Sequence, residues 1–180
     1  MSVTLPSHVL TLDQWAALEQ TTEYTIELVA GVVHVPPGPT VLHQMLVKRI
    51  AALLDTQLPE GWATVTEVDV VLDPSELATV RAPDVVVIPT AFAWSGARRL
   101  TAADVAVVVE VVSPGSGRTD RHLKSVEYAQ AGIGTYWLIG VDGASADLYG
   151  LRGGVYEPAP LAAVLDGVRV ALDVHALRLP

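Results

Sequence analysis

Apolar residues recur along the chain at two spacings, which separate expected helices from expected strands. After Thr40, apolar side chains three and four positions apart form one stripe, which predicts a helix capped by that threonine. The stripe consists of Leu42, Met45, Leu46, Ile50, Leu53 and Leu54. Thr11, with Gln14 three residues later, predicts a shorter helix that opens with a capping box. A third helix is expected from Arg118 or Asp120 to about Ala131, where Gly132 ends it.

Other segments are continuous runs of Val, Ile and aromatic residues, which favour strands. The expected strands cover residues 24–29, 32–35, 62–72, 84–88, 105–112 and 135–141. The β-branched runs at 84–88 and 105–112 are typical of central strands that are covered on both faces. The first two strands are separated by a turn at Ala30-Gly31.

The order of these elements predicts a mixed α/β or α+β fold, with a single layer of sheet and helices packed on it. The length of 180 residues fits one domain over residues 1–180. Residues from about 144 to 180 are expected to form short strands and turns appended to the core. Since 51% of the residues are apolar and 17% are charged, global disorder is excluded. The chain has no cysteine, which excludes disulfides and thiolate metal sites.

The charge balance constrains the function. Twenty Asp and Glu oppose eleven Lys and Arg, for a net charge of −9. Such a chain repels nucleic acid at long range. The longest uncharged stretch, residues 28–47, contains prolines and histidines, so no membrane helix is expected, and a cytoplasmic protein is predicted.

Three acidic residues interrupt apolar runs. Glu27, Asp84 and Glu110 each lie within or at the start of a strand that is otherwise apolar. A buried carboxylate costs several kcal/mol unless it is paired or bound to a metal. Carboxylates on neighbouring strands therefore predict an oxygen-rich site for Mg²⁺ or Mn²⁺.

Each acid also has a plainer explanation. Asp84 at the start of its strand would accept backbone N–H bonds. Glu110 would be buried as a pair with an arginine, and Glu27 would point outward from a half-exposed strand. The sequence leaves these alternatives open.

A basic helix face follows the last acid. Arg118, Arg121 and Lys124 recur every third residue, and Tyr128 lies four residues beyond, so one face is expected to carry them all. This face would point at the carboxylates. Alternatively it is an ordinary solvated surface, with Asp120 and Lys124 as a weak exposed pair.

His43, just after the proline-rich loop at residues 36–39, is expected near a cleft. A metal pair with His34 is the weaker alternative, because no third nitrogen or sulfur ligand is close in the sequence.

Together, these segments resemble the Uma-two family, bacterial proteins classed as restriction endonucleases in the PD-(D/E)xK nuclease superfamily. The resemblance spans roughly residues 10–149 and rests on the order and spacing of several motifs. The matching segments are 24–31, Pro83-Asp84, 110–114, 120–124, 128–133 and Tyr136-Trp137, together with His43. It implies a restriction-endonuclease-like fold, a mixed central sheet flanked by helices. The chain departs from the family at Thr135 and Gly140, where family members often have acids.

By this resemblance, Asp84 and Glu110 would hold Mg²⁺ or Mn²⁺ together with the carbonyl of Val111. The superfamily's usual lysine position is Val112 here, so the catalytic lysine would be Lys124 on the following helix. Glu27 would complete the acidic cluster.

The predicted substrate contacts are Arg121, His43 and Tyr128. The implied function is hydrolysis of DNA phosphodiester bonds by a metal-dependent endonuclease, expected to act as a homodimer. The alternative is a nuclease-like binding or interaction module without catalysis.

Overall fold

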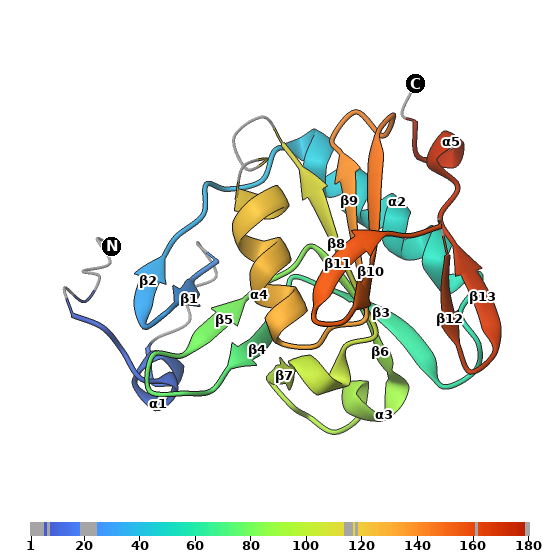
Figure 1. The fold of residues 1–180 in the computed structure, drawn as a ribbon. Helices are drawn as coiled ribbons and strands as arrows, with labels where there is room; N and C mark the ends of the chain where they lie inside the picture. The colour runs from blue at the N-terminus through green and yellow to red at the C-terminus, as the bar shows by residue number, and fades with distance from the viewer. Residues whose placement is uncertain are drawn as a thin grey trace.

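The computed structural model describes residues 6, 8–18, 25–113, 117, 119–160 and 162–178. Two large sheets and one hairpin carry the strands (Figure 1). The six-stranded sheet has the order β11 (Val155–Pro158), β10 (Ala146–Arg152), β9 (Thr135–Gly140), β8 (Val107–Val112), β6 (Val85–Pro89) and β3 (Trp62–Thr66). The five-stranded sheet has the order β2 (Val32–His34), β1 (Glu27–Val29), β5 (Thr79–Arg81), β4 (Asp69–Asp73) and β7 (Arg99–Thr101). The hairpin pairs β12 (Ala162–Leu165) with β13 (Val168–Ala171).

Helices cover the sheets. The α-helices are α1 (Leu12–Ala16), α2 (Val41–Asp55), α3 (Thr90–Ala93), α4 (Ser125–Gln130) and α5 (Val174–Leu177). A 3₁₀ turn spans Ala102–Asp104, and a π-helix, η2 (Thr119–Lys124), leads directly into α4. Helices α2 and α4 lie on opposite faces of the six-stranded sheet (Figure 1). In the described residues, no helix is long and apolar enough to cross a membrane.

Strand β8 lies at the centre of this sheet, parallel to β9 and antiparallel to β6. Its alternate residues Val107, Val109 and Val111 pack toward α2. Val108 points to the other face, where it meets Tyr128 of α4. Both faces of β8 and β6 are therefore covered, which confirms the expectation of buried central strands.

Capping residues in the sequence correctly predicted where the first two helices begin. The capping box of Thr11 and Gln14 is present at α1, and Thr40 caps α2 by accepting a bond from the backbone N–H of His43. The buried side of α2 differs from the predicted stripe, because Leu42 and Met45 are exposed. Its buried residues are Leu46, Val47, Ile50 and Leu54.

The expected arrangement of the strands is corrected in three respects. The strands form two large sheets, not a single layer. The long strand expected over residues 62–72 is two strands in different sheets, because the chain turns at Glu67, which has a left-handed backbone (φ 53°). The strand expected to begin at Tyr24 is observed from Glu27, and Tyr24 lies outside the described residues.

The third helix begins as a π-helix. Its i→i+5 bonding puts more residues in each turn than an α-helix has, so side chains three apart no longer share a face. Gly132 follows the end of α4 with a left-handed backbone (φ 84°), as expected of a helix terminator. Near the C-terminus, β10 and β11 extend the six-stranded sheet, while β12, β13 and α5 pack against the α2 side.

Candidate active site

The pairing of β6 with β8 brings two of the predicted acids together. Val85 lies opposite Val109, so Asp84, just before β6, and Glu110, just after Val109, lie at the same end of this antiparallel pair. Because side chains alternate along a strand, Glu110 emerges on the face of Val108, toward α4. Helix η2 and α4 follow β8 and cover this end of the sheet (Figure 1).

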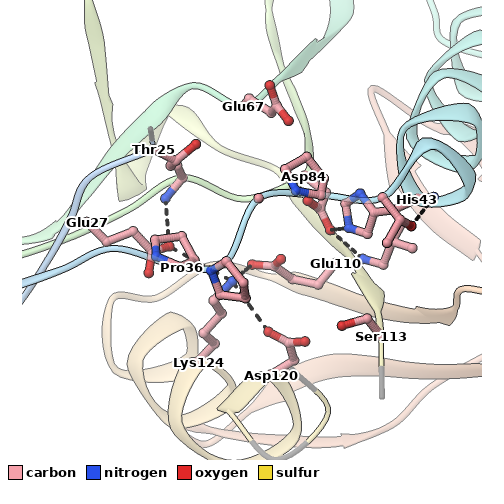
Figure 2. Close-up of a pocket in the computed structure, with 16 residues that line it drawn as sticks. Thr25, Glu27, Pro36, His43, Glu67, Asp84, Glu110, Ser113, Asp120 and Lys124 are labelled. Carbon is pink, nitrogen blue, oxygen red and sulfur yellow. Dashed lines mark hydrogen bonds and ion pairs between the residues drawn. The ribbon is translucent and has the colours of Figure 1, made fainter. Parts of the chain in front are cut away.

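A cavity of about 160 Å³ opens at this point. Residues 36–40 form one wall of it, and the remaining polar groups come from β1, α2, β8, η2 and the loops beside these elements (Figure 2). The acidic residues that line it are Glu27, Glu67, Asp84, Glu110 and Asp120. One lysine, Lys124, also lines the cavity, so its carboxyl groups outnumber its ammonium groups.

Glu110 lies at the centre of the cavity and is 3% exposed. Its Oε1 accepts hydrogen bonds from Lys124 Nζ at 2.8 Å and from the Tyr128 hydroxyl at 2.7 Å. Burial raises the pKa of Glu110 to about 8, and the charges of Asp84 and Asp120 act in the same direction, against that of Lys124. The Glu110 carboxyl therefore retains its proton to a far higher pH than an exposed glutamate does.

Lys124 reaches the cavity from the last position of η2. Its ammonium lies 3.4 Å from Asp120 Oδ1 and 4.0 Å from Glu27 Oε1, in addition to its bond to Glu110. Burial lowers the pKa of Lys124, but the three surrounding acids outweigh burial, and the net pKa lies above the ordinary value. The side chain is therefore a protonated hydrogen-bond donor at neutral pH.

Asp84 is held by the neighbouring strand and by α2. Its Oδ2 accepts the backbone N–H of Val111 at 2.6 Å and lies 3.2 Å from His43 Nε2. The hydrogen bond to Asp84 raises the pKa of His43, although burial opposes the shift. His43 thus lies at the cleft, as expected, and donates toward an acid of the site. The backbone bond predicted for Asp84 as an alternative is also present.

Glu27 is 3% exposed, so the suggestion that it points outward is wrong. Arg81 Nη1 donates to its Oε2 at 2.7 Å, and the backbone N–H of Ala82 donates to Oε1 at 3.3 Å. Burial raises the pKa of Glu27, but Lys124 and Arg81 outweigh burial, and the net pKa is lowered. Glu27 is therefore the ionised partner of both cations.

His34 and His43 belong to different parts of the site. His34 Nδ1 lies 3.4 Å from Glu27, and His43 lies beside Asp84. The metal pair considered for these two histidines is not formed.

The shared basic face is not formed either. Arg121 is exposed, forms an ion pair with Asp147 of β10, and does not line the cavity. Lys124 and Tyr128 do face Glu110. The π-helical turn explains the divergence, because residues 121 and 124 point in different directions there. Arg118 lies outside the described residues.

Three residues of the site, Asp120, Arg81 and Glu67, are not among the predicted residues, and Glu67 lines the cavity from the turn between β3 and β4. Asp120 was considered only as a member of an exposed pair, but it is 2% exposed and lines the cavity. Arg81 was not singled out, although it is 2% exposed and binds Glu27. The available signal was Arg81 at the end of an apolar segment, three residues before Asp84.

Comparison with known proteins identifies the family. A family model named Uma2, described as "Putative restriction endonuclease", matches residues 11–180. The chain belongs to the Uma2 (Uma-two) family. Among solved structures, a "putative nuclease belonging to DUF820" from Anabaena variabilis is similar, with a TM-score of 0.70 and 17% identity over 93% of this chain and 97% of that one. That likeness establishes the shared fold, restriction-endonuclease-like, and confirms the predicted fold class. No curated protein matches the chain.

The Uma2 chain offers oxygen donors that suit a hard divalent cation. Asp84 and Glu110 both line the cavity, next to Val111, whose backbone N–H donates to Asp84. Within the described ranges, no three His, Asp or Glu side chains are grouped as a ready-made metal site. Instead, Lys124 lies among Glu110, Asp120 and Glu27.

Proposed function

We propose that this Uma2 protein is a divalent-metal-dependent endonuclease that hydrolyses DNA phosphodiester bonds at the acid-lined cavity. The observation that carries the proposal is the position of Glu110, buried on a central strand, bonded to Lys124 and lining the same cavity as Asp84. A stable core gains nothing from such a carboxylate, since apolar residues of similar volume are often as stabilising or more so. Catalysis is the better explanation of its presence.

Asp84, Glu110 and the Val111 carbonyl are the proposed holders of Mg²⁺ or Mn²⁺. The bound cation would supply an activated water molecule and neutralise charge on the phosphate. His43 keeps Asp84 oriented through its bond to Oδ2, while Tyr128 does the same for Glu110. Of these two predicted substrate contacts, His43 lines the cavity, whereas Tyr128 is fully buried and does not line it, so its role is to support Glu110.

The proposed role of Lys124 is to donate hydrogen bonds. Since its pKa is raised, its ammonium is a poor general base at neutral pH. It would instead orient the attacking water and stabilise the negative charge that develops on the phosphoryl oxygens. Glu27 and Asp120 provide the other two carboxylates close to this ammonium.

DNA cleavage at low salt tests the proposal. Plasmid and oligonucleotide DNA are incubated with Mg²⁺ or Mn²⁺ and with wild type, Asp84→Asn, Glu110→Gln or Lys124→Met. The matched control is Glu157→Gln, since Glu157 is an exposed acid paired with Arg152. We expect cleavage by wild type and by the control, and strongly reduced cleavage by the three site variants. Equal cleavage by all five proteins would reveal a wrong site or a contaminant.

A catalytically silent binding module is the second candidate. One observation favours it: Lys124 already compensates Glu110, Asp120 and Glu27 without a metal. The acidic net charge also weakens non-specific capture of DNA. Calorimetric titration with Mn²⁺ discriminates the two, because the module predicts no binding and the endonuclease predicts binding that requires Glu110. The homodimer stays a prediction.

A further inference from the structure

Arg81 forms a buried bridge behind the cavity. The residue ends β5, its side chain is 2% exposed, and it does not line the cavity itself. Its Nη1 donates to Glu27 at 2.7 Å. Its Nε and Nη2 donate to the two oxygens of Glu127, at 2.7 and 2.8 Å. One guanidinium thus joins a carboxylate on β1 to a carboxylate on α4.

The first branch of the bridge sets the orientation of Glu27. Arg81 holds Oε2, so the other oxygen, Oε1, faces the Ala82 amide and Lys124. Without the guanidinium, the Glu27 carboxylate would be buried with too few donors and would be free to rotate away from Lys124.

The second branch sets the position of the helix. Glu127 lies three residues after Lys124, just beyond the junction where η2 becomes α4. Helix α4 has six residues, too few to hold its position without tertiary contacts. The bidentate bond from Arg81 fixes the first turn of α4 against β5, and with it the backbone from which Lys124 projects.

We infer that Arg81 is a positioning residue that, through Glu27 and Glu127, keeps the Lys124 ammonium directed at Glu110. The catalytic consequence rests on the proposed function, whereas the geometric claim stands without it. An arginine is required because three of its donors are in use on two carboxylates in different directions. A lysine retains the charge but lacks the planar fork that binds both acids.

The chain provides a direct probe of Lys124, because its only other lysine is Lys48. Lys48 is exposed on α2, while the side chain of Lys124 is 12% exposed and lies among three acids. An amine-reactive acetylating reagent, followed by peptide mass spectrometry, gives the labelling rate of Lys124 relative to that of Lys48 in one sample. In wild type, Lys124 is expected to be strongly protected.

The first test variant is Glu127→Gln, which retains the shape but removes the charge and one acceptor oxygen. We expect the Lys124-to-Lys48 labelling ratio to rise about tenfold, the effect of losing one charged hydrogen bond. Glu157→Gln is the same chemical change at the exposed pair with Arg152, and the ratio should not change. Val170→Ala, at a buried position of β13, controls for general destabilisation and should also leave the ratio unchanged.

The second variant is Arg81→Lys. Its new amine lies in a different proteolytic peptide from Lys124 and Lys48, so their acetylation can still be measured separately. We expect raised labelling of Lys124 here too, and a kcat for DNA cleavage about tenfold lower with KM changed less than twofold. If Arg81→Lys does not fold, Glu127→Gln decides the geometric claim alone.

The outcomes separate the two claims. Raised labelling in Glu127→Gln supports the positioning role even if wild type cleaves no DNA, and that lack of cleavage would count against the proposed function only. A ratio equal to that of wild type in folded Glu127→Gln would overturn the inference, and so would a ratio that rises equally in Val170→Ala.

Discussion

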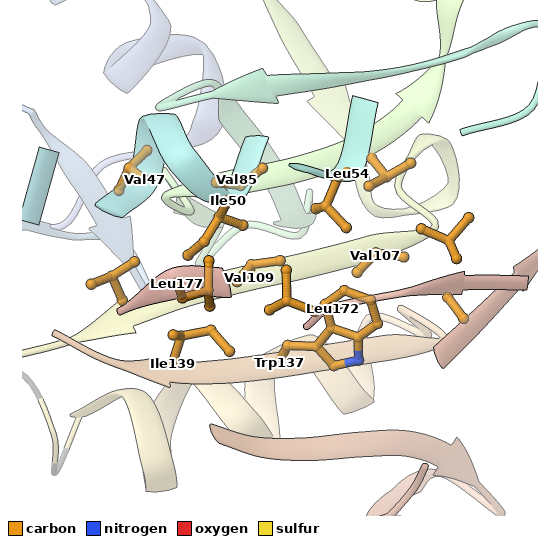
Figure 3. Packing of buried hydrophobic residues seen from close by; sticks show 14 of the residues in the cluster. Val47, Ile50, Leu54, Val85, Val107, Val109, Trp137, Ile139, Leu172 and Leu177 are labelled. Carbon is orange, nitrogen blue, oxygen red and sulfur yellow. The ribbon is translucent and has the colours of Figure 1, made fainter. Parts of the chain in front are cut away.

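The two faces of strand β8 have the same backbone but opposite chemistry. On the α2 face, Val107, Val109 and Val111 pack into a wholly apolar cluster with Ile50 and Trp137 (Figure 3). On the α4 face, the strand begins in the same way with Val108. Two residues later, Glu110 interrupts this apolar packing and lines the acidic cavity (Figure 2).

The two faces of β8 contribute differently to the stability of the fold. Apolar burial on the α2 face stabilises the protein by ~1.5–3 kcal/mol for each large side chain. The α4 end buries Glu110, Asp120 and Glu27 with Lys124 and Arg81, and desolvation of the charges offsets most of their attraction. One face therefore carries the stability of the sheet and the other carries its candidate chemistry, so substitutions on the two faces should affect different properties.

The largest effect is expected on the polar face, for DNA cleavage. Asp84→Asn and Glu110→Gln should each lower kcat/KM by about 10³-fold, because each removes a charged ligand of the proposed cation. Both variants should remain folded, as judged by circular dichroism. Rates within threefold of wild type would separate these acids from the chemistry.

The next effect is expected on the apolar face, for stability. Ile50→Ala removes most of a fully buried side chain on α2 and should lower the free energy of unfolding by ~2–5 kcal/mol. Urea denaturation measures this loss. Measured under conditions where the variant is fully folded, kcat should be close to that of wild type. A large fall in kcat would show that the two faces are coupled.

A smaller and opposite effect is expected for the stability of Glu110→Gln. The folded-state pKa of Glu110 is raised from its ordinary 4.5 to about 8, so between these pH values the folded state binds more protons than the unfolded state. The metal-free wild type thus loses stability from this group as pH rises through that window, and the neutral glutamine does not. The variant should be more stable by ~1 kcal/mol at pH 8.5. Its advantage should shrink toward pH 5.

Denaturation of wild type and Glu110→Gln in chelator at several pH values checks this sign. An advantage that grows as pH falls would mean that Glu110 is stabilised as a carboxylate, contrary to its burial.

The smallest effect is expected for Arg121→Ala. Arg121 and Asp147 are both more than two-fifths exposed, and exposed pairs contribute ~0–1 kcal/mol. Stability should change by less than ~0.5 kcal/mol. Cleavage should stay within twofold of wild type, since the side chain points away from the cavity. A tenfold loss of cleavage activity would instead support the substrate contact predicted for Arg121 from the sequence.

The sequence was most informative where polarity conflicts with burial. Glu110 stands among valines, and that conflict alone located the centre of the cavity. The pairing of Val85 with Val109 then explains why Asp84, just before β6, lies at the same end of the sheet. The caps at Thr11 and Thr40 depend on neighbouring residues only, and both were predicted.

Features that depend on tertiary contacts were not predictable in this way. Asp120 and Arg81 look like surface residues in the sequence, and their burial follows from partners that are distant along the chain or from the docking of a helix. In the π-helical turn at η2, Arg121 and Lys124 point in different directions, whereas α-helical spacing would place them on one face. The left-handed backbone at Glu67 divided one expected strand between two sheets.

Calorimetric titration with Mn²⁺ near pH 8 tests the central claim most directly, that Asp84 and Glu110 form a divalent-cation site. Wild type and Glu157→Gln should bind Mn²⁺ with equal affinity, and Glu110→Gln should not bind it. Binding to wild type should also weaken as pH falls below about 8, because the raised pKa of Glu110 makes protons compete with the ion. Equal binding by Glu110→Gln, or no binding by wild type, would contradict the claim.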